Sequence, residues 1–290
     1  MSYDSVFRPR LFAGQVVIVT GGGSGIGRCT AHELAALGAH VALVGRNPDK
    51  LANVKDEICS EGGLATNHVC DIRDESGVIA AVEGVLSAAG RIDGLVNNAG
   101  GQYRAALNTI STKGFEAVVK TNLTGGFIFM REVYNRWMAR NGGAIVNMIA
   151  DISNGWPNFA HSGASRGGML TLSESAASEW AAAGVRVNTV APGAIASSGL
   201  DTYDAEHRAY IQNEIAGEIP LQRFGTEAEV AAAIVFLLSP AAAFITGSCI
   251  RIDGGAPNAR RVWGKLAASD KSKPYNGFHR AAAPEILASS

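Results

Sequence analysis

The strongest constraint on the fold is a repeated alternation of short apolar runs with segments of helical periodicity. The first run, VVIVT at residues 16–20, is apolar and β-branched throughout, as is typical of a strand buried on both faces of a sheet. Similar runs predict further strands at residues 40–44, 64–70, 92–98, 142–149, 185–193 and 248–253. The patterns between them predict helices at residues 25–37, from Pro48, at 113–139, from Ser162 and at 227–238.

Repeated strand–helix units pack as a parallel sheet with helices on both faces. The seven predicted strands therefore indicate an α/β fold with one doubly wound parallel sheet. No linker divides residues 1–255, which we expect to be a single domain. Residues 194–217 form a long excursion between two sheet elements, and we expect a substrate lid there.

Residues 256–290 differ in composition and are predicted to be a basic C-terminal tail. Residues 260–290 carry six Lys or Arg and two Asp or Glu. Such a tail is either a solvated segment or one that docks on its own or a neighbouring subunit.

Composition argues against several classes of function. The formal net charge of the 290 residues is −1, so neither a nucleic-acid partner nor an anionic membrane is indicated. The four cysteines form no CxxC pair and no Cys/His cluster with metal spacing, so we expect no metal and a reducing compartment. The N-terminus lacks the apolar run of a signal peptide, and no run approaches the roughly 20 residues of a membrane span. We therefore expect a cytoplasmic protein.

A glycine-rich loop, TGGGSGIG, joins the first predicted strand to the first predicted helix. Gly21 and Gly25 allow the backbone to turn and to approach a phosphate closely, and Gly27 allows the helix to pack against the sheet. The helix N-terminus, which includes Ser24 and Ile26, offers free N–H groups to a pyrophosphate. Such a loop alone is a weak signal, but its place between a buried strand and a helix indicates a dinucleotide site.

The second predicted strand ends in LVGRN. An NAD enzyme usually places an Asp or Glu here to bind the ribose 2′-hydroxyl. This chain has Gly45, Arg46 and Asn47 instead, and Arg binds phosphate through a fork of donors. A solvated loop Arg is the alternative, but together with the glycine-rich loop these residues favour NADP over NAD.

Taken in order, TGGGSGIG, NNAG, TNLTG, VNTVAPG and FITGSCIRIDGG resemble the motifs of the short-chain dehydrogenase/reductase superfamily over roughly residues 12–256. The resemblance implies a single-domain Rossmann fold, commonly a homotetramer. Within the superfamily, the chain is most similar to the peroxisomal trans-2-enoyl-CoA reductases and the 2,4-dienoyl-CoA reductases, on GGQY, TNLTGGF, HSGASRGG and VALVGRN among others. The cofactor contacts that the resemblance implies are Asp71 and Ile72 at the adenine, Asn98, Ala99 and Gly100 along the cofactor, and Pro192, Gly193 and Ile195 at the nicotinamide.

The usual catalytic set of this superfamily is Asn, Ser, Tyr and Lys, the last two spaced YxxxK. Asn122 matches the first residue, and the segment RGGMLTLSESAASEW places Arg166 at the Lys position. Ser162 then replaces the Tyr. A register shifted by one residue would place His161 there but would leave Ser165 for the Lys, so we prefer the first register because it keeps a cation at the nicotinamide ribose.

The missing tyrosine is consistent with reduction of a carbon–carbon double bond. A carbonyl reductase must protonate the carbonyl oxygen, a step to which a positioned acid contributes roughly 10²–10⁴-fold, and Ser162 is too weak an acid. When hydride adds to Cβ of an enoyl thioester, negative charge moves to the thioester oxygen, which needs hydrogen-bond donors. Asn122 and Ser162 could donate, and Arg166, always protonated, could hold the ribose hydroxyls. Asp151, near a catalytic position of the dienoyl reductases, could relay a proton.

These observations predict an NADPH-dependent reductase of an enoyl-CoA-like thioester. Two alternatives stay open: an NADP(H)-dependent carbonyl reductase or alcohol dehydrogenase, on a 3-oxoacyl or similar substrate, with an acid other than tyrosine, and a catalytically silent NADP-binding protein. Four other residues are either functional or ordinary packing: His161 as a proton carrier, Tyr103 as a substrate contact, and Trp156 and Phe159 in an acyl pocket.

Overall fold

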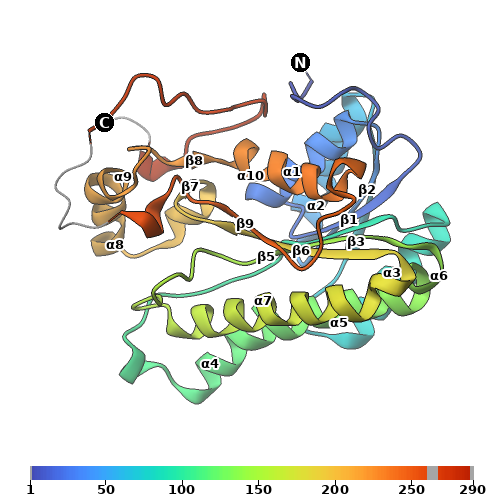
Figure 1. Cartoon of the computed structure of the whole chain (residues 1–290), viewed down its shortest axis with the longest axis horizontal. Coiled ribbons are helices and arrows are strands. Elements are labelled where there is room, and N and C mark those ends of the chain that lie inside the picture. Colours follow the sequence, from blue (N-terminus) through green and yellow to red (C-terminus); the bar gives the residue numbers. More distant parts are fainter. Residues whose placement is uncertain (1, 260–266, 288–290) are drawn as a thin grey trace.

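The centre of the computed structural model, which describes residues 2–259 and 267–287, is a seven-stranded parallel sheet (Figure 1). The strand order is β3-β2-β1-β4-β5-β6-β9, so the direction of winding reverses between β1 and β4. This confirms the predicted single-domain, doubly wound Rossmann-type α/β fold. The strands are β1 (Val16–Thr20), β2 (His40–Gly45), β3 (Leu64–Val69), β4 (Gly94–Asn97), β5 (Gly143–Met148), β6 (Val185–Pro192) and β9 (Cys249–Ile252).

Helices cover both faces of the sheet (Figure 1). One face carries α1 (Gly25–Ala36), α2 (Pro48–Ser60) and α10 (Glu227–Leu238). The other carries α3 (Glu75–Ala89), α4 (Thr112–Val119), α5 (Gly125–Val133), α6 (Ala139–Asn141) and α7 (Ala160–Trp180). Each helical layer buries its own apolar core against the sheet, with Leu34 and Ile234 in one core and Phe129 and Met169 in the other. Short 3₁₀ turns are η1 (Leu107–Thr109), η4 (Ala181–Ala183), η7 (Pro240–Ala242), η8 (Ala256–Asn258) and η10 (Glu285–Leu287).

The single helix expected at residues 113–139 is interrupted by two π-helical turns, η2 (Lys120–Thr124) and η3 (Tyr134–Met138). A π turn shifts the helical register, so it changes which residues face the sheet. After η2, a Cβ at Gly125 would lie 2.9 Å from the carbonyl oxygen of Ile72, and one at Gly126 would lie 2.5 Å from Cε of Met169. The shift therefore brings the smallest residues to the closest approaches. The helix expected to start near Ser162 is α7, which begins two residues earlier, at Ala160.

The excursion expected at residues 194–217 is folded, not an open loop. It contains β7 (Ile195–Ala196), η5 (Ser198–Thr202), α8 (Ala205–Tyr210), the π turn η6 (Ile211–Ile215) and α9 (Ala216–Glu218). The strand β7 pairs in parallel with β8 (Gly225–Thr226), which precedes α10. We call residues 194–217 the lid.

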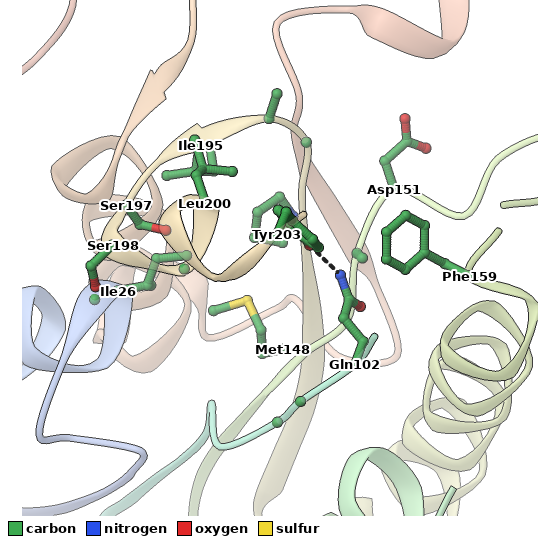
Figure 2. Close-up of a pocket in the computed structure, with 18 of the residues that line it drawn as sticks. Ile26, Gln102, Met148, Asp151, Phe159, Ile195, Ser197, Ser198, Leu200 and Tyr203 are labelled. Carbon is green, nitrogen blue, oxygen red and sulfur yellow. Dashed lines mark hydrogen bonds between the residues drawn. The ribbon is translucent and has the colours of Figure 1, made fainter. Parts of the chain in front are cut away.

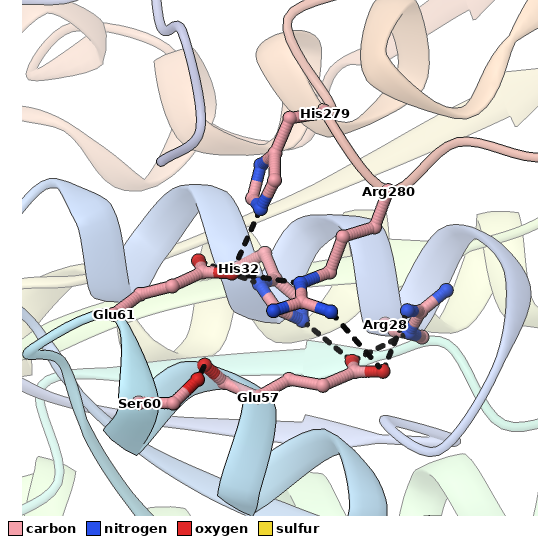
Figure 3. Close-up of polar contacts among 7 residues, drawn as sticks. All are labelled: Arg28, His32, Glu57, Ser60, Glu61, His279 and Arg280. Carbon is pink, nitrogen blue, oxygen red and sulfur yellow. Dashed lines mark hydrogen bonds and ion pairs between the residues drawn. The ribbon is translucent and has the colours of Figure 1, made fainter. Parts of the chain in front are cut away.

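The tail returns across the molecule toward the N-terminal helices (Figure 1). His279 and Arg280 both pair with Glu61 at the end of α2, each at 2.7 Å (Figure 3). The carbonyl oxygen of Tyr275 accepts a hydrogen bond of 2.6 Å from Thr226 Oγ1. Of the two alternatives for the tail, docking on its own chain therefore holds for residues 267–287, while 260–266 and 288–290 lie outside the described residues.

The end of the tail also contacts the lid. The backbone N–H groups of Glu285 and Ile286 donate to the carboxylate of Asp201, at 3.1 and 2.9 Å. The amide of Gln212 donates to the carbonyl oxygen of Ile286 at 2.6 Å. The tail thus connects the lid to α1 and to the end of α2. Among the residues described, no helix has the length and apolarity needed to cross a membrane.

Candidate active site

A cleft of about 2320 Å³ lies at the carboxyl ends of the strands, where ligands bind in doubly wound folds. This volume exceeds the roughly 300–1,000 Å³ of an ordinary small-molecule pocket, so the cleft can hold a dinucleotide together with a substrate. The loops after β1, β2, β3 and β4 form one end, and residues 148–159 and the lid form the other.

The glycine-rich loop is shaped as a phosphate cradle. Gly21 and Gly25 have φ of +68° and +57°, a backbone conformation that L side chains rarely adopt. A Cβ at Gly27 would lie 2.3 Å from the carbonyl oxygen of Gly21, so this glycine lets α1 pack against the loop itself. Gly21, Gly25, Ser24 and Ile26 line the cleft.

The loop after β4 holds the opposite side of the cradle. The hydroxyl of Thr20 accepts the backbone N–H groups of Asn98 and Ala99, each at 3.0 Å. The side-chain amide of Asn98 donates to the carbonyl oxygen of Thr20 at 2.9 Å. Asn98, Ala99 and Gly100 line the cleft.

The far end of the cleft is cationic. Gly45, Arg46 and Asn47 line it, and Asn47 also caps α2 by accepting the Lys50 N–H at 2.9 Å. The carboxylate of Asp71, on the adjacent loop with Ile72, pairs with Arg73 at 2.6 Å, and this guanidinium lowers the pKa of Asp71 to about 2. Sequence reasoning missed two cations that line this end, Lys50 and Arg73, although RNPDK and DIRD contain them.

Arg166 occupies the centre of the cleft. Its Nη1 donates to the carbonyl oxygen of Met148 at 2.6 Å, and a Cβ at Gly100 would lie 2.5 Å from its Nη2. Burial lowers the pKa of Arg166 to about 10, so the guanidinium is charged at neutral pH. Its buried Nε has no hydrogen-bond partner among the residues that the structure describes. A glycine cradle and a buried cation with an unused donor fit a phosphate-bearing, ribose-bearing cofactor.

Asn122 and Ser162 lie together but behind the wall of the cleft. Asn122, in η2, accepts the Gly101 N–H at 2.9 Å and donates to Ser162 Oγ at 3.5 Å. The side chain of Ser162 is buried, and its hydroxyl donates to Oε1 of Gln102 at 2.7 Å. Neither Asn122 nor Ser162 is among the described residues that line the cleft. Gln102 lines it instead.

Gln102 connects this buried pair to the lid. Its Nε2 donates to the hydroxyl of Tyr203 at 2.9 Å, across the cleft, and both side chains line it (Figure 2). Neither residue was among the sequence predictions. GGQY contains Gln102, but nothing in the sequence relates it to a tyrosine 101 residues away.

The remaining predicted residues divide into two groups. Asp151, Trp156 and Phe159 line the cleft, and Asp151 accepts the Ser153 N–H at 3.1 Å. Pro192, Gly193 and Ile195, at the end of β6 and in the lid, line it too. His161 and Tyr103 pack against each other, with ring centroids 4.4 Å apart, and are not among the described residues that line the cleft.

The chain belongs to the short-chain dehydrogenase/reductase superfamily: the family model described as "Enoyl-(Acyl carrier protein) reductase" matches residues 21–257. Its relatives and structural neighbours are dehydrogenases and reductases, so it is an oxidoreductase of a family that binds NAD or NADP.

Three similar proteins illustrate the range of substrates in their names. The peroxisomal 2,4-dienoyl-CoA reductase of Danio rerio is 35% identical over 259 residues, which are 88% of this chain and 85% of that protein. A citronellol catabolism dehydrogenase of Pseudomonas aeruginosa is 56% identical, with a TM-score of 0.79, over 88% of this chain and 100% of its own. A putative gluconate 5-dehydrogenase of Beutenbergia cavernae, solved with NADP, is 36% identical with a TM-score of 0.79, over 87% and 100%.

Proposed function

We propose that this protein is an NADPH-dependent reductase of the C=C bond of an enoyl-CoA-like thioester. The proposal rests on the residues found at the centre of the cleft. There the buried cation of Arg166 replaces the lysine, α7 offers only the buried Ser162 in place of a tyrosine, and amide and hydroxyl donors face the cleft instead. This arrangement suits a reaction that needs an oxyanion to be stabilised more than a carbonyl oxygen to be protonated at once.

The cofactor would lie along the cleft. The glycine cradle, with Ser24 and Ile26, would hold its pyrophosphate, and Arg46 would pair with its 2′-phosphate. Asp71 and Ile72 would border the adenine. Asn98, Ala99 and Gly100 would pack along it, with Pro192, Gly193 and Ile195 beside the nicotinamide. When bound, NADPH supplies the hydride.

The catalytic residues would have separate tasks. Arg166 would hold the ribose hydroxyls and supply fixed positive charge. Asn122 and Ser162 would hold Gln102, whose amide faces the cleft, so their effect on the substrate oxygen passes through that side chain. Asp151, at the open rim of the cleft, would relay a proton from water to Cα.

The names of the relatives support this reading in part. The dienoyl-CoA reductase of Danio rerio and a protein of Bacillus subtilis named a probable dienoyl-CoA reductase are both 35% identical to this chain. The alternative, a carbonyl reductase or alcohol dehydrogenase, is favoured by the 56% identity to a citronellol catabolism dehydrogenase. A phenol, Tyr203, also lines the cleft and could act as the acid.

One assay separates the two functions. NADPH oxidation is followed with crotonyl-CoA and with acetoacetyl-CoA, and NADP reduction is followed with citronellol. The proposal expects turnover of crotonyl-CoA well above that of the other two. Turnover of acetoacetyl-CoA or citronellol alone would establish the alternative.

Three further expectations belong to the proposal. The enzyme is a homotetramer that takes a small-molecule substrate, with no nucleic-acid or membrane partner. It works in the cytoplasm, a reducing compartment, which suits its four free cysteines. The lid encloses the substrate within a domain of residues 1–255.

A further inference from the structure

The structure places a lid phenol opposite Gln102, and we propose that Tyr203 donates the hydrogen bond that stabilises the negative charge on the substrate oxygen. Gln102 and Ser162 act as positioning residues for it. This inference rests on the proposed function in one respect: the reaction of a reductase places negative charge on a substrate oxygen at the centre of the cleft.

The direction of the hydrogen bonds is set by a backbone group that can only donate. The Gly101 N–H donates to Oδ1 of Asn122 at 2.9 Å, so the Nδ2 of Asn122 must be the atom that faces Ser162. Ser162 Oγ accepts there, and its own hydrogen goes to Oε1 of Gln102. The other end of Gln102, Nε2, therefore donates to Tyr203.

The last member of this chain has a hydrogen left over. Tyr203 accepts from Gln102, so its own O–H hydrogen is available, and it has no partner among the residues that the structure describes. Since Tyr203 lines the cleft, this hydrogen is available to a ligand there. The hydrogen bonds from Asn122 through Ser162 and Gln102 to Tyr203 thus all run toward the cleft, although Nδ2 of Asn122 also donates to the carbonyl oxygen of Gly101 at 3.0 Å. Neighbouring hydrogen bonds that share one direction polarise one another.

The ring of Tyr203 is also held in place. It packs edge-on against Phe159, with centroids 5.8 Å apart, and against His207, at 4.9 Å. Figure 2 shows Tyr203 and Gln102 pointing toward one another from opposite walls, with Met148 nearby. The carbonyl oxygen of Met148 accepts from Arg166, so the phenol and the buried cation stand at the same part of the cleft.

The consequence for the reaction is that the lid completes the site. A preorganised donor aimed at a developing oxyanion contributes roughly 10²–10³-fold to kcat. Tyr203 follows η5 of the lid, so its phenol reaches the oxygen only when the lid lies over the cleft, as it does here.

The test compares Tyr203→Phe with Tyr275→Phe, using whichever of crotonyl-CoA, acetoacetyl-CoA and citronellol the unmodified protein turns over. Tyr203→Phe keeps the ring and its packing, and we expect kcat to fall about 10²–10³-fold with KM and the NADPH dissociation constant changed little. Tyr275 lies in the tail, outside the described lining of the cleft, and its hydroxyl donates to the carbonyl oxygen of Asp4 at 3.0 Å, so Tyr275→Phe should stay within about twofold. Equal small effects of the two variants, with both proteins folded, would overturn the role of Tyr203.

A second comparison tests the positioning residues. If Gln102 acts through Tyr203, then Gln102→Leu should lower kcat, and the double variant Gln102→Leu with Tyr203→Phe should be no slower than Tyr203→Phe alone. Multiplying effects would show that Gln102 acts independently and would overturn the chain. Which of the three substrates is turned over tests the proposed function separately. Oxidation of an alcohol such as citronellol also needs a hydrogen-bonding group at the substrate oxygen, so the role of Tyr203 does not depend on that outcome. A folded protein that turned over none of the three substrates would overturn both proposals.

Discussion

Arg46 stands exposed at the rim of the cleft, where a single side chain can set the choice of cofactor. No carboxylate is present at Gly45 to bind a free 2′-hydroxyl, and Lys50 adds a second cation nearby. We therefore expect the charge at this end of the cleft to select a phosphorylated ribose.

We expect Arg46→Ala to weaken NADPH binding by about 1.5–3 kcal/mol, the scale of a charge-assisted hydrogen bond. NADH binding should change little, because its ribose carries no phosphate. Fluorescence titration of both cofactors measures the two dissociation constants. Equal affinities of the unmodified protein for NADPH and NADH would contradict the assignment.

Arg166 and Ser162 lie one helical turn apart on α7 but have different surroundings, and their variants should differ. Arg166→Ala removes a buried charge beside Gly100, so we expect kcat to fall at least about 10²-fold and NADPH binding to weaken. Ser162→Ala removes one neutral hydrogen bond to Gln102 and should cost about 3- to 10-fold. Steady-state kinetics on the preferred substrate compares them, with Arg166→Lys as the charge-preserving control. A larger loss in Ser162→Ala would refute this order.

Restoring the family pattern should not improve the enzyme. The side chain of Ser162 is buried and its hydroxyl lies 2.7 Å from Gln102, so the phenol of Ser162→Tyr must displace Gln102 to reach the cleft. We expect the double variant Ser162→Tyr with Arg166→Lys to lose enoyl-CoA reduction and to gain at most a trace of 3-oxoacyl-CoA reduction. Faster crotonyl-CoA turnover would count against the proposed function.

At the scale of elements, the packing of α1 against the glycine-rich loop depends on the close approach at Gly27. A Cβ at Gly27 would meet the Gly21 carbonyl oxygen at 2.3 Å and the Asn98 amide at 2.5 Å, and backbone cannot move aside as a flexible side chain can. We expect Gly27→Ala to abolish measurable NADPH binding and to lower the melting temperature. Gly217→Ala, in α9 with open space around it, is the matched control and should be neutral or slightly stabilising. Unchanged cofactor affinity in Gly27→Ala would show that the loop can shift.

The sequence was sufficient for elements that depend on local pattern. The strands were predicted to within about two residues. Central strands such as β1 and β6 are largely apolar runs because they are buried on both faces, whereas the edge strands β3 and β9 are only partly buried. The helix at residues 227–238 was predicted with its observed bounds, and a capping box of Thr226 and Glu229 defines where it begins. The π turns and the folded lid were not predicted, because they depend on packing between segments that are distant in the sequence.

The same distinction applies to the candidate site. Gly21 and Arg46 could be named from the loops after the first two strands, because such loops meet at one edge of a parallel sheet, and Asp71 could be named only from the resemblance to the superfamily. The link from Ser162 through Gln102 to Tyr203 could not, since its members lie 60 and 101 residues apart and only the folded lid brings them together.

At the scale of the whole molecule, the N-terminal segment is joined to α1 by a buried carboxyl. Glu33 accepts from Ser5 at 2.8 Å and from Tyr3 at 3.2 Å, and burial raises its pKa to about 7. Because the folded-state pKa is raised, this group contributes stability that is fully present below about pH 4.3 and is lost as pH rises through about 7.

We expect Glu33→Gln, which removes this titration, to gain stability relative to the unmodified protein as pH rises from 5 to 8. The difference should approach about 1.4 kcal/mol for each unit by which the pKa is raised. Melting temperatures of both proteins, measured across this range, give the comparison. A constant difference between them would show that Glu33 is ionised throughout.

At the scale of the whole molecule, the exposed faces of α4, α5 and α7 bear on how subunits assemble. Phe115 on α4 and Phe127 on α5 are 38% and 39% exposed, and α7 presents Ser175 and Ser178, small residues that permit close helix–helix approach. We expect these helices to form a subunit interface. Light scattering at micromolar concentration should give about four times the chain mass of 30.1 kDa. A monomer under these conditions would contradict the proposed homotetramer.

The tail that fastens the lid has a consequence for how the enzyme is made. Asp201 of the lid accepts N–H groups from residues 84 and 85 positions further along the chain. At roughly 5–20 residues per second, synthesis of that stretch takes about 4–17 s. During this interval the nucleotide-binding half of the sheet can already fold on the ribosome, whereas the lid still lacks its fastening. The growing chain can therefore acquire cofactor before its substrate site is complete, and catalytic competence is expected to be the last property that it gains.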